Sequence, residues 1–284
     1  MKLVRFGPSG REKPGIVDKS GVIRDLSRVV RDITPETLAD GAIAEIRKAK
    51  IDRLPPAPKR VRLGPPVGNV RHLIAIGLNY ADHAAEAGLP VPKEPIIFAK
   101  APNSVVGPND NVMIPRGAKK TDWEVELAIV IGKGGLYIDE AKALSHVAGY
   151  TICNDVSERE YQIERGGSWT KGKGFPSFGP LGPWLVTRDE VKDPQNLEMF
   201  LDVNGVRMQN GNTSTMIFGV AHLVSYVSQF FRLDAGDIIT TGTPPGVGQG
   251  KKPEPIYLKG GETMRLGITG LGEQTQKVVK YKGK

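Results

Sequence analysis

Short apolar segments separated by clusters of Gly and Pro run along most of the chain, a pattern typical of a β-rich protein. In the larger, C-terminal part they predict strands at residues 72–77, 96–99, 123–131, 147–153, 197–203, 237–241, 264–268 and 276–281, and around Tyr257. Helices are predicted at residues 81–87, 141–144 and 215–231. Asn204-Gly205 suits the type I′ turn of a hairpin. Because strands outnumber helices and do not alternate with them, the pattern excludes a doubly wound α/β fold and favours a mixed or largely antiparallel β architecture.

The first part of the chain is predicted to form a small unit of its own. Its strands are expected at residues 2–6 and 15–18, and its helices near 27–32 and 35–50. Pro-rich segments at residues 54–58 and 63–67 follow, and such segments often separate domains. We therefore predict a small N-terminal α+β domain of residues 1–65 and a β-rich catalytic domain of residues 70–284.

Composition narrows the class of protein. Of the 284 residues, 39% are hydrophobic, which is enough for a core. No segment approaches the run of about 20 apolar residues that spans a bilayer, and the N-terminus lacks the apolar core of a signal peptide. Cys153 is the single cysteine, so no internal disulfide can form. We expect a cytoplasmic protein with no membrane partner.

The formal net charge of +8 raises the question of a nucleic-acid partner. The Lys and Arg residues are scattered, however, and aromatic residues, which form base-stacking platforms, make up 6% of the chain. We therefore expect no nucleic-acid partner. A basic surface also favours a small anionic substrate.

The sharpest chemical signal is the segment Asp-Trp-Glu-Val-Glu that contains Glu124 and Glu126. In a strand these two residues share a face, roughly 6–7 Å apart, and that face becomes apolar from Ala128 onward. A divalent cation would remove the repulsion of two poorly hydrated carboxylates, and oxygen ligands favour Mg²⁺, Mn²⁺ or Ca²⁺. Asp155, at the end of the next apolar segment, is a third candidate ligand. The alternatives are an edge strand with its acidic face in water, and an ordinary Asn-Asp turn or helix cap at Asp155.

His83 and Glu86 form a second candidate group, because positions i and i+3 of a helix are neighbours. A carboxylate there can hold one ring nitrogen and leave the other to take a proton from water. A surface His–Glu pair is the alternative, and the spacing alone favours it. Lys173 lies in a Gly- and Pro-rich segment, predicted to be a loop, that can place its ammonium beside an anion, although solvated loop lysines are commoner.

Residues 240–248, rich in Thr and Gly, follow a predicted strand and offer amides and hydroxyls that could cradle a carboxylate. This segment lacks the Gly-Lys-Ser/Thr ending of a phosphate loop, so it does not indicate nucleotide binding. Cys153 ends an apolar segment and fits a core residue better than a nucleophile.

Taken together, these segments resemble the fumarylacetoacetate hydrolase family from about Arg71 to the C-terminus. Five motifs occur in the family's order: Gly77-Leu-Asn-Tyr-x-x-His-x-x-Glu, Asp122-x-Glu-x-Glu-Leu, Asn154-Asp-Val-Ser-x-Arg-x-x-Gln, Gly172-Lys with Pro180-x-Gly-Pro, and Thr241-Gly-Thr-Pro-x-Gly-Val. Each motif alone is weak, whereas five in order are specific. The resemblance implies a catalytic domain with a mixed β-sandwich roll, usually assembled as a homodimer.

The resemblance also implies roles for individual residues. Glu124, Glu126 and Asp155 would bind Mg²⁺ or Mn²⁺, and Ca²⁺ could substitute. His83 and Glu86 would activate a water on a lid that orders over the substrate, with Lys173 as a further catalytic residue. The positions that match substrate-binding residues are Tyr80, Arg159, Gln162 and Thr243.

One departure from the family pattern concerns the lysine. Many members carry an aspartate three residues after it, and this chain has Pro176 there. A carboxylate that could orient Lys173 is therefore missing, which leaves the role of this lysine and the identity of the substrate open.

The resemblance implies a metal-dependent hydrolase that cleaves a C–C bond in a small diketo acid, either an acylpyruvate or a diketo-deoxy-sugar acid. The metal would chelate the 2-keto acid and stabilise the developing enolate, while His83, held by Glu86, deprotonates the attacking water. Lys173 and Arg159 would hold or neutralise anionic groups. An isomerase or decarboxylase of 2-keto dicarboxylates on the same metal site is the alternative within enzymes. A metal-dependent sugar-acid binding protein would not need His83 and Glu86.

Overall fold

The computed structural model describes residues 1–39, 41–86 and 88–283, and it confirms a strand-rich α+β fold. The strands are β1 (Lys2–Phe6), β2 (Lys13–Val17), β3 (Ile23–Asp25), β4 (Leu63–Gly64), β5 (Leu73–Gly77), β6 (Ile96–Lys100), β7 (Val105–Val106), β8 (Val112–Ile114), β9 (Thr121–Asp122), β10 (Val125–Ile131), β11 (Val147–Asn154), β12 (Ser157–Glu158), β13 (Gly179–Thr187), β14 (Glu198–Val203), β15 (Val206–Asn212), β16 (Ile238–Thr240), β17 (Thr263–Ile268) and β18 (Gly272–Lys280). The α-helices are α1 (Pro35–Ala39), α2 (Ala42–Lys48), α3 (Ala81–Glu86), α4 (Glu140–Ala143), α5 (Trp169–Lys173) and α6 (Val220–Val227). Short helical turns are η1 (Ile51–Arg53), η2 (Pro102–Ser104), η3 (Leu144–His146), η4 (Glu160–Glu164, a π-helix), η5 (Arg188–Glu190), η6 (Thr213–Thr215) and η7 (Gly248–Gly250).

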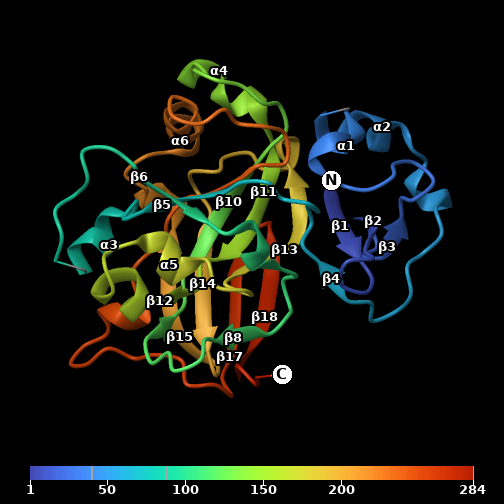
Figure 1. Cartoon of the computed structure of the whole chain (residues 1–284). Coiled ribbons are helices and arrows are strands. Elements are labelled where there is room, and N and C mark those ends of the chain that lie inside the picture. The colour runs from blue at the N-terminus through green and yellow to red at the C-terminus, as the bar shows by residue number, and fades with distance from the viewer. Residues whose placement is uncertain (40, 87, 284) are drawn as a thin grey trace.

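Two sheets pack against each other in the body of the molecule. The larger sheet has the strand order β3-β2-β1-β13-β11-β10-β16-β5-β6, with β4 paired to β1 and β7 to β13, and the smaller has the order β15-β14-β17-β18-β8. Strands β10 and β11 of the larger sheet contact β14, β17 and β18 of the smaller one. Figure 1 shows the two sheets in the body, with α4 and α6 at one end and α3 and α5 along one side.

The N-terminal strands continue the larger sheet. Strand β1 pairs antiparallel with β13, through Lys2↔Val186 and Leu3↔Leu185. The first residues nevertheless lie to one side of the body (Figure 1). The predicted division into domains of residues 1–65 and 70–284 stays a prediction.

Strand β10 is buried on both faces, as its sequence indicates. Val125, Leu127 and Ile129 belong to the core between the two sheets. Ala128 and Val130, on the opposite face, belong to a second core that includes residues of the N-terminal part. A carboxylate at the start of this strand is therefore surrounded by protein on both sides.

The predicted helix over residues 215–231 is wrong in length, because only Val220–Val227 is α-helical. The residues before it are held by Asn79, a partner far away in sequence: the Ile217 amide donates to the Asn79 carbonyl (2.8 Å) and the Phe218 amide to Asn79 Oδ1 (2.9 Å). Tertiary hydrogen bonds thus override a local helical pattern.

The predictions for the N-terminal helices also need correction. Residues 27–29 form a turn closed by the amides of Val29 and Val30, which both donate to the Leu26 carbonyl, and no further bond of this kind extends it into a helix over residues 27–32. The predicted helix over residues 35–50 is two helices, α1 and α2, and Gly41 before α2 has a left-handed φ of 84° that a regular helix cannot include. Asp40, Ala87 at the end of the predicted helix 81–87, and Lys284 lie outside the described residues.

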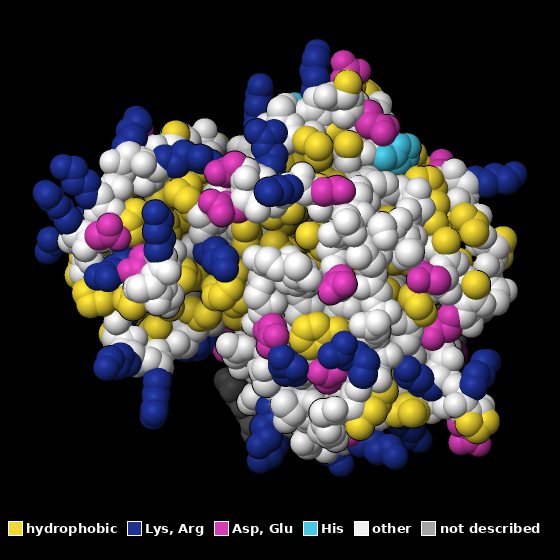
Figure 2. Space-filling view, turned by 180° about the vertical axis from the view of Figure 1, so that it is seen from behind, with side chains coloured by type: hydrophobic (Ala, Val, Ile, Leu, Met, Phe, Trp, Pro, Cys, Tyr) yellow, Lys and Arg dark blue, Asp and Glu magenta, His cyan; other side chains and the backbone are white. Residues whose placement is uncertain are grey.

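Three further findings concern the hairpin turn, the length of the helices and the surface. Asn204 and Gly205 both have positive φ (51° and 79°), as a type I′ turn requires, which confirms the hairpin. Within the described ranges, no helix is long and apolar enough to cross a membrane. On the face in Figure 2, Lys and Arg side chains are dispersed among acidic and apolar ones.

Candidate active site

Three buried carboxylates meet at one end of the strand pair β10–β11. In this antiparallel pair Val125 lies opposite Asn154, so Glu126 on one strand and Asp155, just past the other, come to the same end. Glu124 precedes β10, and its carbonyl accepts the Asp155 amide (2.8 Å). Carboxylate oxygens of Glu124, Glu126 and Asp155 lie within 4.8 Å of one another. The structure therefore brings the three predicted acids together.

Basic side chains neutralise two of the three acids. Lys173 Nζ donates to Glu124 Oε2 (2.7 Å) and to Asp155 Oδ2 (2.6 Å), and Arg159 Nη2 lies 2.7 Å from Glu124 Oε1. Glu126 instead accepts the Gly242 amide (3.0 Å) and forms no ion pair with the basic residues that the structure describes.

The pKa values of the two glutamates move in opposite directions. Burial raises the pKa of Glu124, but the positive charges of Lys173 and Arg159 outweigh it and lower this pKa to about 2. Burial, together with the negative charges of Asp155 and Glu124, raises the pKa of Glu126 well above its ordinary value. Among the described residues, no cationic side chain therefore compensates the charge of an ionised Glu126.

These residues fit a divalent cation. The donors are carboxylate oxygens alone, the ligands that Mg²⁺, Mn²⁺ and Ca²⁺ prefer. An ion held by Glu124, Glu126 and Asp155 would supply the positive charge that Glu126 lacks. Since the acids are buried, the alternative of an acidic face in water does not apply.

His83 and Glu86 lie at the rim of the same site, on helix α3. His83 Nδ1 lies 3.0 Å from Glu86 Oε2, so this pair is formed as the i, i+3 spacing predicts. Burial raises the pKa of Glu86, but hydrogen bonds from His83 and the Gly246 amide outweigh it, and the net effect lowers this pKa. An ionised Glu86 favours a proton on Nδ1, which leaves Nε2 able to accept one.

A loop after β16 joins this pair to the carboxylate cluster. The Gly246 amide donates to Glu86 Oε1 (2.9 Å), and the amides of Gly248 (2.6 Å) and Gln249 (3.0 Å) donate to the two oxygens of Asp122. Asp122 directly precedes the segment that carries Glu124. The loop thus contacts both α3 and the segment that carries the candidate metal ligand Glu124.

Of the predicted substrate-binding residues, Arg159, Gln162 and Thr243 line the cavity at this site. The Arg159 guanidinium donates to Asp122 Oδ2 (2.8 Å) and to Gln162 Oε1 (3.0 Å), in addition to its ion pair with Glu124. The Thr243 hydroxyl donates to the Val125 carbonyl (2.9 Å).

Tyr80 and Lys173 differ from what the sequence suggested. Tyr80 does not line the cavity, because its ring is fully buried and its hydroxyl donates to Met199 Sδ (3.2 Å), so the structure gives no support for substrate binding by this residue. Lys173 is the last residue of α5 and is buried, whereas we expected it in a loop. Pro176 is exposed, and Glu124 and Asp155 provide the carboxylates that orient Lys173.

Lys100 is a residue that the sequence analysis missed. Its buried Nζ forms an ion pair with Asp155 Oδ1 and donates to the carbonyls of Lys173 (2.6 Å) and Val156 (3.3 Å). Its position in the sequence could have indicated this role, because Lys100 ends the apolar segment Ile96–Lys100 and a charge buried there needs a partner of opposite charge.

The site opens into a cavity of 360 Å³, within the usual range for small-molecule sites. Glu124, Glu126, Lys173, His83 and Glu86 all line it. Candidate metal ligands and a candidate general base therefore face the same space.

The carboxylate cluster is a candidate metal site in a strand-rich α+β fold, and similarity to known proteins identifies the family. The family profile described as "Fumarylacetoacetate (FAA) hydrolase C-terminal" matches residues 72–279. A protein of Burkholderia orbicola (strain MC0-3) named "Putative hydrolase" is 60% identical over 277 residues, covering 98% of both chains. The chain belongs to the fumarylacetoacetate hydrolase family.

Solved structures of this family resemble the chain over nearly its whole length. A fumarylacetoacetate hydrolase from Exiguobacterium antarcticum is 35% identical (TM-score 0.85), covering 99% of this chain and 100% of that one. A probable 2-hydroxyhepta-2,4-diene-1,7-dioate isomerase from Mycobacterium abscessus is 34% identical (TM-score 0.84), covering 100% of both. Maleylpyruvate hydrolase from Sphingobium sp. SYK-6, in complex with manganese(II) and pyruvate, is 27% identical (TM-score 0.82), covering 99% and 100%. The relatives are thus named as hydrolases and as isomerases.

Proposed function

We propose that this protein is a divalent-metal-dependent hydrolase that cleaves a C–C bond in an acylpyruvate or a related diketo acid. The observation that carries the proposal is the buried carboxylate cluster in one cavity with the His83–Glu86 pair. The ion would be Mg²⁺ or Mn²⁺, and the relative crystallised with manganese(II) and pyruvate supports an ion of this class.

The bound ion would act as a Lewis acid on the carboxylate and 2-keto oxygens of the substrate. The chain's own residues supply the water. His83, held by Glu86 at 3.0 Å, takes a proton from water at Nε2. The hydroxide oxygen then adds to the distal carbonyl carbon, and the bond from that carbon to the methylene breaks. The electron pair moves into the 2-keto group, and protonation of the methylene carbon yields pyruvate and a carboxylic acid.

Lys173 and Arg159 support this reaction by charge. Both are buried and already aligned with the carboxylates, so they change position little when an anionic substrate enters. Burial lowers the pKa of Lys173, but the charges of Asp155 and Glu124 outweigh it and raise this pKa, so the lysine stays cationic. It can balance negative charge that develops on the substrate.

An isomerase or decarboxylase acting on a 2-keto dicarboxylate at the same site is the second candidate, and the isomerase from Mycobacterium abscessus favours it. Both reactions use the cation, but neither needs the hydroxide that the His83–Glu86 pair provides. The presence of that pair in the cavity is the reason to prefer the hydrolase.

The proposal is tested with purified protein, Mg²⁺ or Mn²⁺, and a panel of acylpyruvates, diketo-sugar acids and oxaloacetate, with products identified by chromatography. The hydrolase predicts equal amounts of pyruvate and carboxylic acid from an acylpyruvate, with no turnover in EDTA. Decarboxylation or double-bond migration without any cleavage of an acylpyruvate would favour the second candidate.

A further inference from the structure

The cavity is lined by two chemically different sets of side chains, called here its polar half and its apolar half. The polar half comprises Glu124, Glu126, Arg159, Lys173, Gln162 and the His83–Glu86 pair. The other half is lined by apolar side chains, namely Ile76, Leu78, Leu89, Ile163, Trp169 and Val247. Leu89 and Ile163 stand on different segments, after α3 and within η4, yet both are about half exposed, at 49% and 53%. A ligand that covers them would bury apolar surface that now faces water.

The indole of Trp169, which lines the apolar half, packs against the backbone of Gly77. A Cβ atom added to Gly77 would lie 2.2 Å from Trp169 Cζ3, so the ring lies directly on a backbone that only glycine permits. Its other neighbour is Phe98, at 5.2 Å between ring centroids and 61° between planes, an edge-to-face contact. The Trp169 part of the wall is therefore in place without a ligand, which lowers the entropic cost of binding.

Few positive charges remain for a second carboxylate of the substrate. Arg159 and Lys173 already pair with Glu124, and Lys251 Nζ donates to the Met208 carbonyl (3.0 Å). Among the described residues that line the cavity, the basic side chain without such a partner is the exposed Lys252, in the segment that forms the rim.

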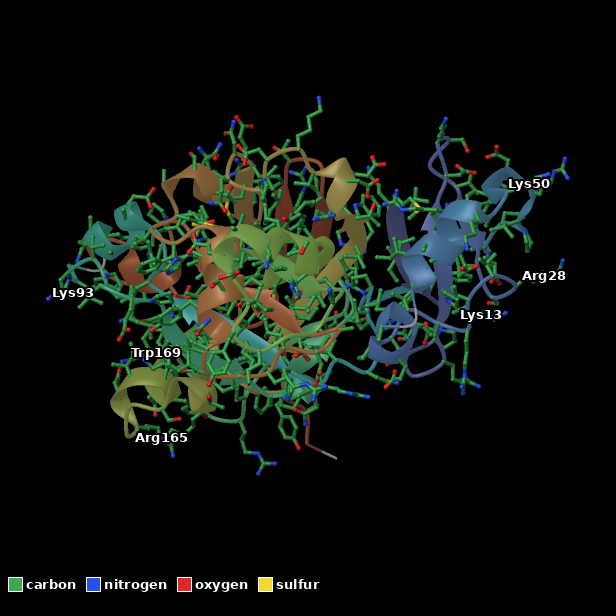
Figure 3. The ribbon with its side chains drawn as sticks, turned by 90° about the horizontal axis from the view of Figure 1, so that it is seen from above. Lys13, Arg28, Lys50, Lys93, Arg165 and Trp169 are labelled. Atoms are coloured by element: carbon green, nitrogen blue, oxygen red, sulfur yellow. The ribbon has the colours of Figure 1, made fainter. Side chains whose placement is uncertain are left out.

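Other basic side chains near the cavity do not turn into it. Figure 3 shows Lys93 and Arg165 at the outer edge of the molecule, with Trp169 nearer its centre. The guanidinium of Arg165 lies over the Tyr161 ring (5.0 Å), and neither Arg165 nor Lys93 lines the cavity. Among the described residues that line the cavity, the exposed Lys252 is therefore the one Lys or Arg left for a second carboxylate.

We propose that the apolar half, built on Trp169, Leu89 and Ile163, binds an uncharged alkyl or aryl tail, so that the natural substrate is a monocarboxylic acylpyruvate with an apolar acyl group. The inference rests on the proposed function for the identity of the head group. It goes further by excluding acids with a second, distal carboxylate as preferred substrates.

The test separates binding of the tail from catalysis. Dissociation constants of pyruvate, 2-oxobutanoate, 2-oxohexanoate and 2-oxooctanoate are measured by calorimetry in the presence of Mg²⁺. These 2-oxo acids lack the distal carbonyl and cannot be cleaved. Burial of each methylene is expected to tighten binding about fourfold until the apolar half is filled. The dicarboxylate 2-oxoadipate should bind more weakly than 2-oxohexanoate, which has the same number of carbons.

Substitutions of Trp169 and Lys252 test whether the gain in affinity with chain length arises from the apolar half of the cavity. Trp169→Ala should reduce the affinity ratio of 2-oxooctanoate to pyruvate at least tenfold, and Trp169→Phe should retain most of it. Lys252→Ala is the control for the rim charge, and it should leave that ratio unchanged. A chain-length series without any gain in affinity would overturn the inference. Tighter binding of 2-oxoadipate that is lost in Lys252→Ala would overturn it as well.

Failure of the proposed hydrolysis can be distinguished from failure of the proposed apolar subsite. If acylpyruvates are not cleaved but affinity still rises with chain length, the reaction is wrong and the apolar subsite stands. If acetylpyruvate is cleaved but the series is flat, the reaction stands and the subsite is wrong.

Discussion

Replacing Glu126 by Gln should stabilise the metal-free protein and abolish its response to Mg²⁺. Glu126 is the member of the cluster without an ion pair to any residue that the structure describes, and its pKa is raised by burial and by Asp155 and Glu124. Glutamine has the same shape and can still accept the Gly242 amide. The substitution therefore removes a negative charge that is useful only when a metal cation is bound and that is repelled by its neighbours when the site is empty.

The magnitude follows from the distances. Two unit charges 4.8 Å apart repel by about 3 kcal/mol at an effective dielectric constant near 20. Part of this is avoided by protonation, so we expect a gain of about 1–3 kcal/mol, or roughly 2–5 °C in melting temperature for a chain of this size. Mg²⁺ at about 100 times its dissociation constant should add about 2.7 kcal/mol to the wild type and almost nothing to the variant.

The pH dependence has a definite sign. Because the pKa of Glu126 is raised, the folded metal-free protein holds a proton that the unfolded chain releases above the ordinary value of 4.5. The stability linked to this proton is complete below 4.5 and is lost as the pH rises through the folded-state pKa. The advantage of Glu126→Gln over the wild type in EDTA should therefore grow with pH.

The assay is thermal unfolding in EDTA and in excess Mg²⁺, from pH 5 to pH 9. Glu124→Gln is the matched control, because Glu124 pairs with Lys173 and Arg159 and its pKa is lowered to about 2. That variant should lose stability in EDTA, since two buried cations each lose one of their carboxylate partners. A Glu126→Gln protein that melts below the wild type in EDTA, or that retains the full Mg²⁺ response, would refute the reasoning.

Three further predictions concern the His83–Glu86 pair, the segment that carries this pair, and the buried Lys100. His83→Ala should slow acylpyruvate hydrolysis by about 10²–10⁴ while it preserves the Mg²⁺ response and slows oxaloacetate decarboxylation less; wild-type hydrolysis would show that the His83–Glu86 pair is structural. Amides of residues 81–86 and 88–95 should exchange hydrogen quickly without ligand and slowly with Mg²⁺ and oxalate, and strong protection without ligand would argue against a lid. Lys100→Met should destabilise the protein by about 3–5 kcal/mol, measured by denaturant unfolding, because Asp155 and two carbonyls lose a buried partner; a loss below 1 kcal/mol would contradict this.

The local parts of the site could be predicted from the sequence. Strand periodicity placed Glu124 and Glu126 on one face of a strand that the structure shows to be buried on both sides. Helical periodicity paired His83 with Glu86. Both inferences depend on neighbours within three residues, where backbone geometry fixes which side chains meet.

The parts that depend on contacts between distant residues could not be predicted. Lys100 reaches Asp155 from the edge strand β6, and the strand order β10-β16-β5-β6 that relates them is not encoded in any local pattern. Asn79 interrupts the apparent helix over residues 215–231 for the same reason. Tyr80 matched a family motif, but its buried hydroxyl donates to Met199 Sδ and it is not among the residues that line the cavity, so its role in substrate binding stays a prediction.

The central claim is that water activated beside the carboxylate cluster cleaves a C–C bond. The most direct test is turnover of acetylpyruvate with Mg²⁺ in ¹⁸O-labelled water, with the products analysed by mass spectrometry. The account predicts acetate that carries one ¹⁸O from the solvent, formed in equal amount with pyruvate, and no products in EDTA or with Glu126→Gln. Intact acetylpyruvate after prolonged incubation, or cleavage that proceeds equally well in EDTA, would contradict it.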